Sequence, residues 1–173
     1  MNEAIKNMIE RQSVRAFRSD PIPNEALELI LEAGKHAPTG RNNQSPIIIA
    51  VTNKHLRDEI SKMNARIMGT DTDPFYGAPV ILIVLANKKF PTYIYDGSLV
   101  MQNLMLSATS LGIGSCWIHR AKEEFDSDEG KKILADLGIE GDYEGIGHVA
   151  LGYADCAPMP KKPRKENYVY YVK

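Results

Sequence analysis

Two unbroken apolar runs constrain the fold of this chain more than any other feature. Residues 46–51 read PIIIAV and residues 78–86 read APVILIVLA. Neither run alternates with polar residues, as a strand with one solvent-facing side would. We therefore expect two strands that are buried on both faces, with helices on both sides of the sheet that contains them.

Helices are predicted over five other stretches, in which apolar residues recur at helical spacing. The run 98–111, SLVMQNLMLSATSL, is apolar nearly all round, which favours a central helix or a subunit interface. Asp96 or Ser98 is expected to cap its start, and Gly112 or Gly114 to end it. The other four helices are expected at residues 4–10, around 27–31 and ending by Pro38, at 54–68, and near 129–137.

Two shorter strands and a C-terminal arm complete the predicted organisation. SCWI (115–118) and HVALGY (148–153) are strand candidates. The tail, CAPMPKKPRKENYVYYVK, is a proline-rich arm with an alternating, β-prone end that need not pack on its own chain. Helices and strands are mixed along 173 residues, which predicts a single domain of the α/β or α+β class with a three-layer core.

Composition excludes several classes of function. The formal net charge is −1, so we expect no nucleic acid and no anionic membrane as a partner. The longest apolar runs are about ten residues, well short of the roughly 20 that span a bilayer. The first residues, MNEAIKNMIERQ, have no apolar core and do not resemble a signal peptide. With only two cysteines, far apart, a reducing cytoplasmic location is expected.

The common catalytic and metal motifs are absent from the chain. There is no phosphate-binding P-loop, no GxGxxG, no GxSxG, no HExxH and no CxxC. The four histidines show no metal-ligand spacing, so no metal is expected. Cys116 and Cys156 are interpreted as a core and a loop cysteine rather than nucleophiles. Trp117 and Tyr76 are interpreted as core or interface aromatics rather than residues that stack on a cofactor.

Two basic segments at opposite ends of the chain are candidate phosphate ligands. RQSVRAF (11–17) brings Arg11, Ser13 and Arg15, although a surface loop with arginines for solubility has the same composition. The tail brings Lys161, Lys162, Arg164 and Lys165, which would also suit a solvated arm. Arginine binds phosphate through a rigid, bidentate fork. Together, in a nearly neutral chain, the two segments suggest one phosphate held from both sides.

The polar stretch APTGRNNQSP (37–46) is either a connecting loop or a ligand loop. The amides of Asn42 and Gln44 each offer a donor and an acceptor, which suits the edge of a flat polar ring. The stretch leads directly into the buried run PIIIAV, and ligands commonly bind at the ends of such strands.

These segments resemble those of the flavin-dependent nitroreductase family. The resemblance rests on RQSVRAF, APTGRNNQSP, DGSLVMQNLMLSATSLGIGSCWI and HVALGYADCAPMPKKPR, which occur in the family's order and at its spacing over nearly the whole chain. It implies an α+β three-layer sandwich with a central, mainly antiparallel sheet. It also implies a homodimer in which the arm, about residues 156–173, adds to the partner's sheet, and FMN bound where the two subunits meet.

The resemblance also implies roles for particular residues. Arg11, Gln12, Ser13 and Arg15 would contact the phosphate and the ring edge. Pro38, Thr39, Gly40, Asn42 and Gln44 would form the loop that the second subunit lays against the flavin. The backbone of Ile118, His119 and Arg120 would approach the isoalloxazine, and one amide there would donate to N5. The basic residues Lys162 and Arg164 would close on the phosphate.

The chain departs from the family pattern in three places. Gln12 stands where a second basic residue is common. The family commonly has an aromatic after the Gln-Pro that ends the loop motif, whereas this chain has Ser45-Pro46-Ile47. The chain is also short, so the helices that shape the substrate pocket in longer members are expected to be missing.

The implied activity is reduction of nitroaromatics, quinones or similar small molecules by NADH or NADPH, in a ping-pong scheme that needs no side-chain acid or base. A flavin reductase, a reductive dehalogenase-like or enoyl-type reductase, a non-catalytic FMN carrier or sensor, and a dimeric scaffold with a degenerate site remain alternatives. The acceptor pocket is expected around residues 64–77 and 120–130.

Overall fold

Four strands form one antiparallel sheet at the centre of the structure, a computed structural model that describes residues 1–173. The sheet order is β1-β2-β4-β3, and every neighbouring pair is antiparallel. The two ends of this order, β1 and β3, are the edge strands. The strands are β1 (Pro46–Val51), β2 (Val80–Asn87), β3 (Gly114–Ile118) and β4 (Tyr143–Gly152).

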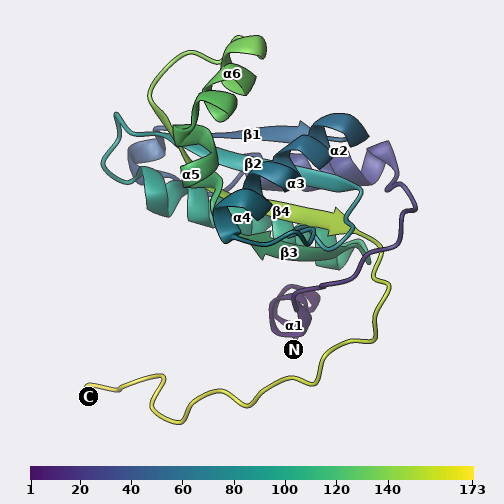
Figure 1. Ribbon diagram of the computed structural model, residues 1–173. Coiled ribbons are helices and arrows are strands. Elements are labelled where there is room, and N and C mark those ends of the chain that lie inside the picture. Colours follow the sequence, from purple (N-terminus) through teal and green to yellow (C-terminus); the bar gives the residue numbers. More distant parts are fainter.

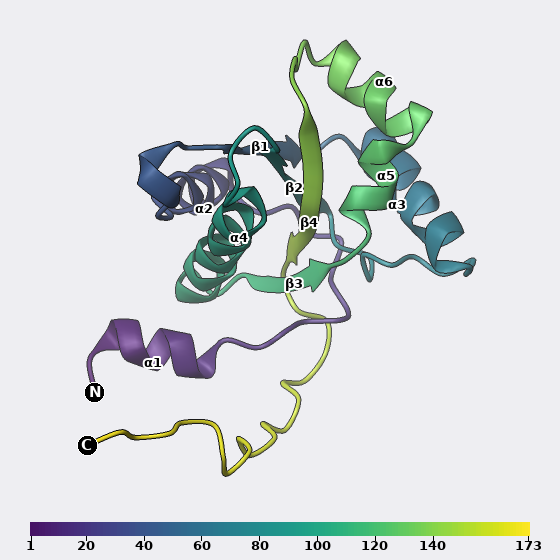
Figure 2. The same cartoon turned by 90° about the vertical axis from the view of Figure 1, so that its left-hand side faces the viewer.

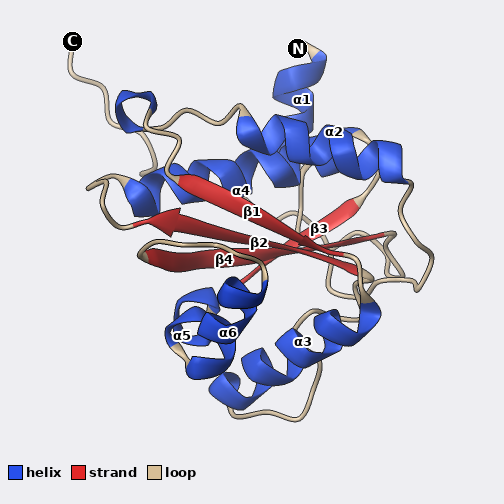
Figure 3. Ribbon diagram, turned by 90° about the horizontal axis from the view of Figure 1, so that it is seen from above, coloured by secondary structure: helices blue, strands red, loops and turns tan.

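Helices cover both faces of this sheet, as the apolar runs predicted (Figure 3). One face carries α2 (Asn24–Lys35) and α4 (Tyr93–Ser110). The other carries α3 (Lys54–Met68), α5 (Ala121–Asp126) and α6 (Asp128–Asp136). The predicted α+β class, with a three-layer core around an antiparallel sheet, is confirmed.

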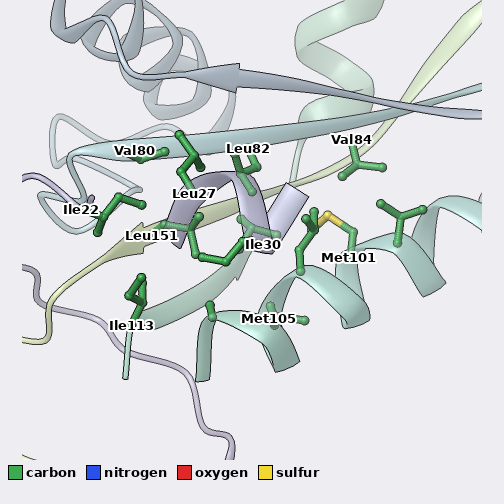
Figure 4. Close-up of a cluster of buried hydrophobic side chains, with 14 of the residues drawn as sticks. Ile22, Leu27, Ile30, Val80, Leu82, Val84, Met101, Met105, Ile113 and Leu151 are labelled. Atoms are coloured by element: carbon green, nitrogen blue, oxygen red, sulfur yellow. The ribbon is translucent and has the colours of Figure 1, made fainter. Parts of the chain in front are cut away.

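The side chains of β2 alternate between two separate hydrophobic clusters, one on each face of the sheet. Val80, Leu82 and Val84 belong to the cluster that includes α2 and α4 (Figure 4). Ile81 and Ile83 belong to the cluster that includes α3, α5 and α6. Because both faces are dry, every position of the strand favours an apolar residue, which explains why the sequence does not alternate.

Helices α2 and α4 pack closely because Gly34 presents no side chain at their crossing. A Cβ atom at Gly34 would lie 2.6 Å from Leu104 Cδ2 and 3.0 Å from Ile48 Cδ1. Asn103 Nδ2 also donates a hydrogen bond of 2.9 Å to the Ala33 carbonyl. The two helices therefore pack together as one layer on this face of the sheet.

The two ends of the chain lie outside these layers (Figures 1 and 2). Helix α1 (Glu3–Glu10) has no buried residue, and Ile5, Met8 and Ile9 are about half exposed. Residues 156–173 form no helix or strand and are exposed throughout, and only the start of the arm, at residues 156–159, lies against the segment 12–15 of its own chain.

Helix α4 differs from its prediction at its start. It begins at Tyr93 rather than near Ser98, and neither Asp96 nor Ser98 caps it. Thr92 precedes the first turn without a side-chain cap, and Gly112 follows the helix in the left-handed conformation at φ 71°. No helix of the structure, α4 included, is both long and apolar enough to cross a lipid bilayer.

Strand β4 begins at Tyr143, earlier than the predicted start at His148, and helix α5 was not predicted at all. The start of β4 was missed because glycines interrupt its apolar pattern. A Cβ atom at Gly145 would lie 2.2 Å from the Ala121 carbonyl oxygen, and one at Gly147 would lie 2.8 Å from Trp117 Nε1. The first half of β4 is therefore rich in glycine because neighbouring groups pack directly on its backbone.

Candidate functional site

The segment RQSVRAF lies along the outer edge of β3. The Val14 N–H donates to the Ser115 carbonyl at 2.9 Å, and Ser13 forms a parallel bridge with Ser115. The contact is close because Gly114 leaves room for it: a Cβ there would lie 2.9 Å from Val14 Cγ2. In an extended segment alternate side chains share one face, so positions 11, 13 and 15 face the same way.

The pKa of the Cys116 thiol responds to all three of these residues, which places them near it. Burial raises the pKa of Cys116, while the charge of Arg15, a hydrogen bond with Ser13 and the charge of Arg11 act in the opposite direction. Cys116 itself is buried in the core, and Cys156 is exposed on the arm, as their interpretation as core and loop cysteines predicted. The structure thus gathers two positive charges and a hydroxyl beside one strand.

A hollow of about 250 Å³ lies next to this cluster. Residues 12–15 form one wall and residues 154 and 156–159 the other, and Arg15 Nη1 lies 3.8 Å from Met159 Sδ across it. Ser115, the bridge partner of Ser13, has a buried Oγ without a hydrogen-bond partner and does not line the hollow. Pockets for whole cofactors usually measure about 300 to 1,000 Å³, so this hollow suits one end of a nucleotide rather than all of it.

The residues that follow β3 form a second part of the candidate site. Ile118 is buried, His119 is exposed and Arg120 is half-buried. Arg120 has a left-handed backbone at φ 78°, which is uncommon for a residue with a side chain. A hollow of about 310 Å³ opens beside them, and its lining includes Trp117 and Glu144.

The loop before β1 is held from inside by the carboxylate of Asp96. Asp96 is 2% exposed, and its Oδ1 accepts a hydrogen bond of 2.9 Å from the Gly40 N–H. Its Oδ2 accepts from Thr92 Oγ1 at 2.9 Å and from Ser45 Oγ at 3.1 Å. Asp96 was predicted to cap α4, but its side chain instead fixes the loop to the first turns of that helix.

Three residues of the same loop have positive φ values although none is glycine. They are Arg41 at 54°, Asn42 at 55° and Gln44 at 50°. The Gln44 N–H donates to Thr39 Oγ1 at 3.0 Å, which stabilises the tight turn. Such strain persists only where surrounding contacts impose it, and it is concentrated at functional sites. The side chains of Asn42 and Gln44 are exposed, available to a ligand outside this chain's own core.

A single copy of the chain does not bring all predicted site residues together. The loop 38–44 precedes β1, whereas the segment with Arg11, Ser13 and Arg15 lies against β3. These two strands are at opposite edges of the sheet, with β2 and β4 between them. Lys162 and Arg164 are exposed on the arm, away from the layers (Figure 2). The structure therefore unites Arg11, Gln12, Ser13 and Arg15 beside β3, which continues into residues 118–120.

Three buried polar side chains near this site carried no local sequence signal. Asn64 of α3 is fully buried and bonds to the His119 carbonyl and to Arg120. Glu124 of α5 and His148 of β4 are also fully buried, with Oε2 and Nε2 2.7 Å apart but not aligned for a straight hydrogen bond. Each pairing joins segments distant in sequence, so only the fold reveals it.

Comparisons with known proteins agree with this architecture. The model of the nitroreductase family matches residues 8–74 and 68–153. The chain is 31% identical over 159 residues to an Archaeoglobus fulgidus protein with the provisional name NADH dehydrogenase/NAD(P)H nitroreductase, covering 88% of this chain and 86% of the relative.

Solved structures extend the likeness to the whole fold. A nitroreductase with bound FMN from Bacteroides fragilis is 30% identical, with a TM-score of 0.91 and full coverage of both chains. A nitroreductase with bound FMN from Desulfitobacterium hafniense is also 30% identical, with a TM-score of 0.89 and full coverage of both chains. Since the family model and these relatives extend over most of its length, the chain belongs to the nitroreductase family.

Proposed function

We propose that this chain is an FMN-dependent oxidoreductase that uses NADH or NADPH to reduce small organic acceptors such as nitroaromatics or quinones. FMN supplies the redox chemistry when bound, accepting hydride and passing electrons on, with donor and acceptor using one site in turn. The observation that carries the proposal is the position of Arg11, Ser13 and Arg15 on a segment that lies along β3 and lines a hollow there. It occurs in a fold whose relatives from B. fragilis and D. hafniense are described with bound FMN.

The donors beside β3 fit the phosphate end of FMN. Two arginines offer charge-assisted, bidentate hydrogen bonds to phosphate oxygens, and Ser13 adds a hydroxyl. Gln12 adds an uncharged amide to this set, so two arginines rather than three basic residues would provide its charge.

The other predicted ligands would complete the site around this phosphate end. Backbone groups of residues 118–120 would approach the isoalloxazine ring. Lys162 and Arg164 would reach the phosphate if the arm folds back. The loop residues would come from a second subunit: Pro38, Thr39, Gly40, Asn42 and Gln44.

A homodimer would bring these separated parts together. The exposed apolar residues on α1, on the start of α4 and on the arm support this part of the proposal, since a lone chain rarely exposes so many. The outer edge of β1 is unpaired, and a hollow of about 510 Å³ lies beside it. The arm of a second subunit could join the sheet as a further strand there. The exposed apolar residues include Met8, Ile9, Ile94, Tyr95, Leu99, Tyr170 and Val172.

Light scattering on the full chain tests the homodimer directly. We expect twice the mass of one chain for the full protein. A protein that lacks residues 156–173 should have the mass of a single truncated chain. A full-length protein that is monomeric at every concentration would contradict the homodimer.

An anaerobic titration tests the flavin and its reduction together. The purified protein, or the apoprotein with added FMN, should show a flavin spectrum that NADH or NADPH bleaches and that a nitroaromatic or quinone restores. A protein that fails to bind FMN contradicts the proposal. Bound FMN that neither nicotinamide reduces would favour a non-catalytic carrier or sensor. A cytoplasmic location, where NAD(P)H is available, agrees with two unpaired cysteines.

A flavin reductase is a second candidate function. It is supported by a relative, an NADPH-flavin oxidoreductase from Vibrio harveyi that is 24% identical. Added free FMN should then accelerate NAD(P)H oxidation more than a nitroaromatic at equal concentration. A reductive dehalogenase-like activity would instead require a halogenated aromatic as the best acceptor.

A further inference from the structure

Asn64 occupies an unusual position, because both ends of its buried amide bond to the two residues that follow β3. Its side chain is fully buried in α3. Its Nδ2 donates to the His119 carbonyl at 2.9 Å, and its Oδ1 accepts from Arg120 Nε at 2.9 Å. Breaking either bond would leave a buried polar group without a partner, so Asn64 anchors this segment to α3.

The first of these bonds fixes the direction of a peptide N–H. A trans peptide is planar, with its C=O and N–H pointing in opposite directions. The His119 C=O points at Asn64, so the Arg120 N–H of the same peptide points away from α3. No oxygen of the chain accepts a hydrogen bond from this N–H. It is an oriented donor that remains available to a ligand.

The backbone at Arg120 shows that this orientation has to be enforced. Its φ of 78° is unfavourable for any residue with a Cβ atom. If the peptide between His119 and Arg120 turned over, the His119 C=O would leave Asn64 and Arg120 would return to negative φ. The bonds to Asn64 therefore oppose a relaxation that the local backbone favours.

We propose that Asn64 is a positioning residue for the flavin: it holds the His119–Arg120 peptide so that the Arg120 N–H donates to N5 of bound FMN. The inference rests on the proposed function, because it requires FMN beside residues 118–120. In oxidised flavin N5 has a lone pair that accepts such a bond, whereas in reduced flavin N5 carries a hydrogen. An N–H fixed at N5 therefore stabilises the oxidised form more than the reduced form.

Asn64→Ala tests the proposal through FMN affinity and midpoint potential. Losing one oriented hydrogen bond should weaken binding of oxidised FMN about tenfold and leave binding of reduced FMN nearly unchanged. A tenfold rise in the dissociation constant of oxidised FMN relative to that of reduced FMN raises the midpoint potential by about 30 mV for a two-electron couple. Fluorescence titration of the apoprotein and an equilibrium dye method measure the two quantities.

Asn64→Asp separates the two bonds, because it keeps an acceptor for Arg120 Nε and removes the donor to the His119 carbonyl. We expect its midpoint potential to differ from wild type, whereas a wild-type potential would overturn the proposal. Because aspartate has the same shape as asparagine, this variant keeps the test available if Asn64→Ala does not fold.

Ser61→Ala is the matched control, since Ser61 is buried on the same helix but its Oγ donates to Asp73 at 2.7 Å, away from residues 119–120. It should lower stability without changing the midpoint potential. Equal potentials in Asn64→Ala and wild type, or an equal shift in Ser61→Ala, would overturn the proposal. If wild-type protein binds no FMN, the proposed function itself fails, which is a separate result.

Discussion

The Gly40 N–H donates a hydrogen bond of 2.9 Å to Asp96 Oδ1, so a residue inside α4 holds the loop that leads into β1. The same carboxylate accepts from Thr92 and Ser45, and it is almost completely buried. Three donors on one buried carboxylate make the loop part of the helix layer. This is how a polar segment with three left-handed residues keeps one shape.

Asp96→Asn should destabilise the protein by about 2 kcal/mol, because an amide cannot accept all three hydrogen bonds and brings donors of its own. Urea unfolding followed by circular dichroism measures the change. Asp71→Asn, at an exposed position, is the control and should be neutral within about 0.5 kcal/mol. Equal stability of the two variants would mean that the carboxylate does not hold the loop.

Gly34→Ala should also destabilise, by about 1 kcal/mol, although alanine is the better helix former by a similar amount. The sign is decided by packing, since the new Cβ would lie 2.6 Å from Leu104 Cδ2. In a Leu104→Ala background the same change should be neutral or stabilising, because the obstructing atom is gone. Thermal unfolding of the four proteins in this cycle provides the measurement. A destabilisation that persists without Leu104 would contradict the explanation.

Arg11→Ala and Arg15→Ala should each weaken FMN binding about tenfold or more, because each removes a charge-assisted contact with the phosphate. The loss should shrink as salt is added, since the phosphate contact is electrostatic. Arg18→Ala, directly after this segment, is the control: Arg18 pairs with Asp20 at 3.4 Å and lies over the Tyr153 ring instead. Unchanged FMN affinity in both arginine variants would favour a scaffold with a degenerate site.

The half-buried carboxylate of Asp73 should make stability depend on pH in the acid range. Burial acts to raise the pKa of Asp73, but hydrogen bonds from Arg57, Ser61 and the N–H groups of Phe75 and Gly77 outweigh it and lower the pKa. A carboxyl group whose pKa is lower in the folded state stabilises the protein above its unfolded pKa, near 4. That stability is lost as the pH falls through the lower, folded value.

Urea unfolding between neutral pH and about pH 3 measures this effect, with Asp73→Asn as the comparison. The variant should be less stable than wild type at neutral pH, and the difference should narrow as the solution is acidified. A constant difference across this range would show that Asp73 does not cause the pH dependence.

Local pattern was sufficient for the elements that are uniformly apolar or clearly bounded. The runs at 46–51 and 54–68 match β1 and α3 residue for residue. The helix is bounded by Asn53, whose side chain accepts from the Leu56 N–H, and by the left-handed Gly69. The start of α4 was missed because a proline and a glycine flank YIYD, and there the helix depends on the contacts of Asp96.

The sequence patterns by themselves determined a mixed α/β or α+β class with a sheet buried on both faces, and the resemblance to nitroreductases added the antiparallel sheet and the segments from which a flavin site could be built. The tertiary structure alone decided which of those segments meet. Asn64 reaches His119 and Asp96 reaches Gly40 across more than fifty residues, and Ser13 lies beside Ser115 across about a hundred. Such contacts depend on strand order and helix placement, and these follow from how the whole core packs rather than from any local window of sequence.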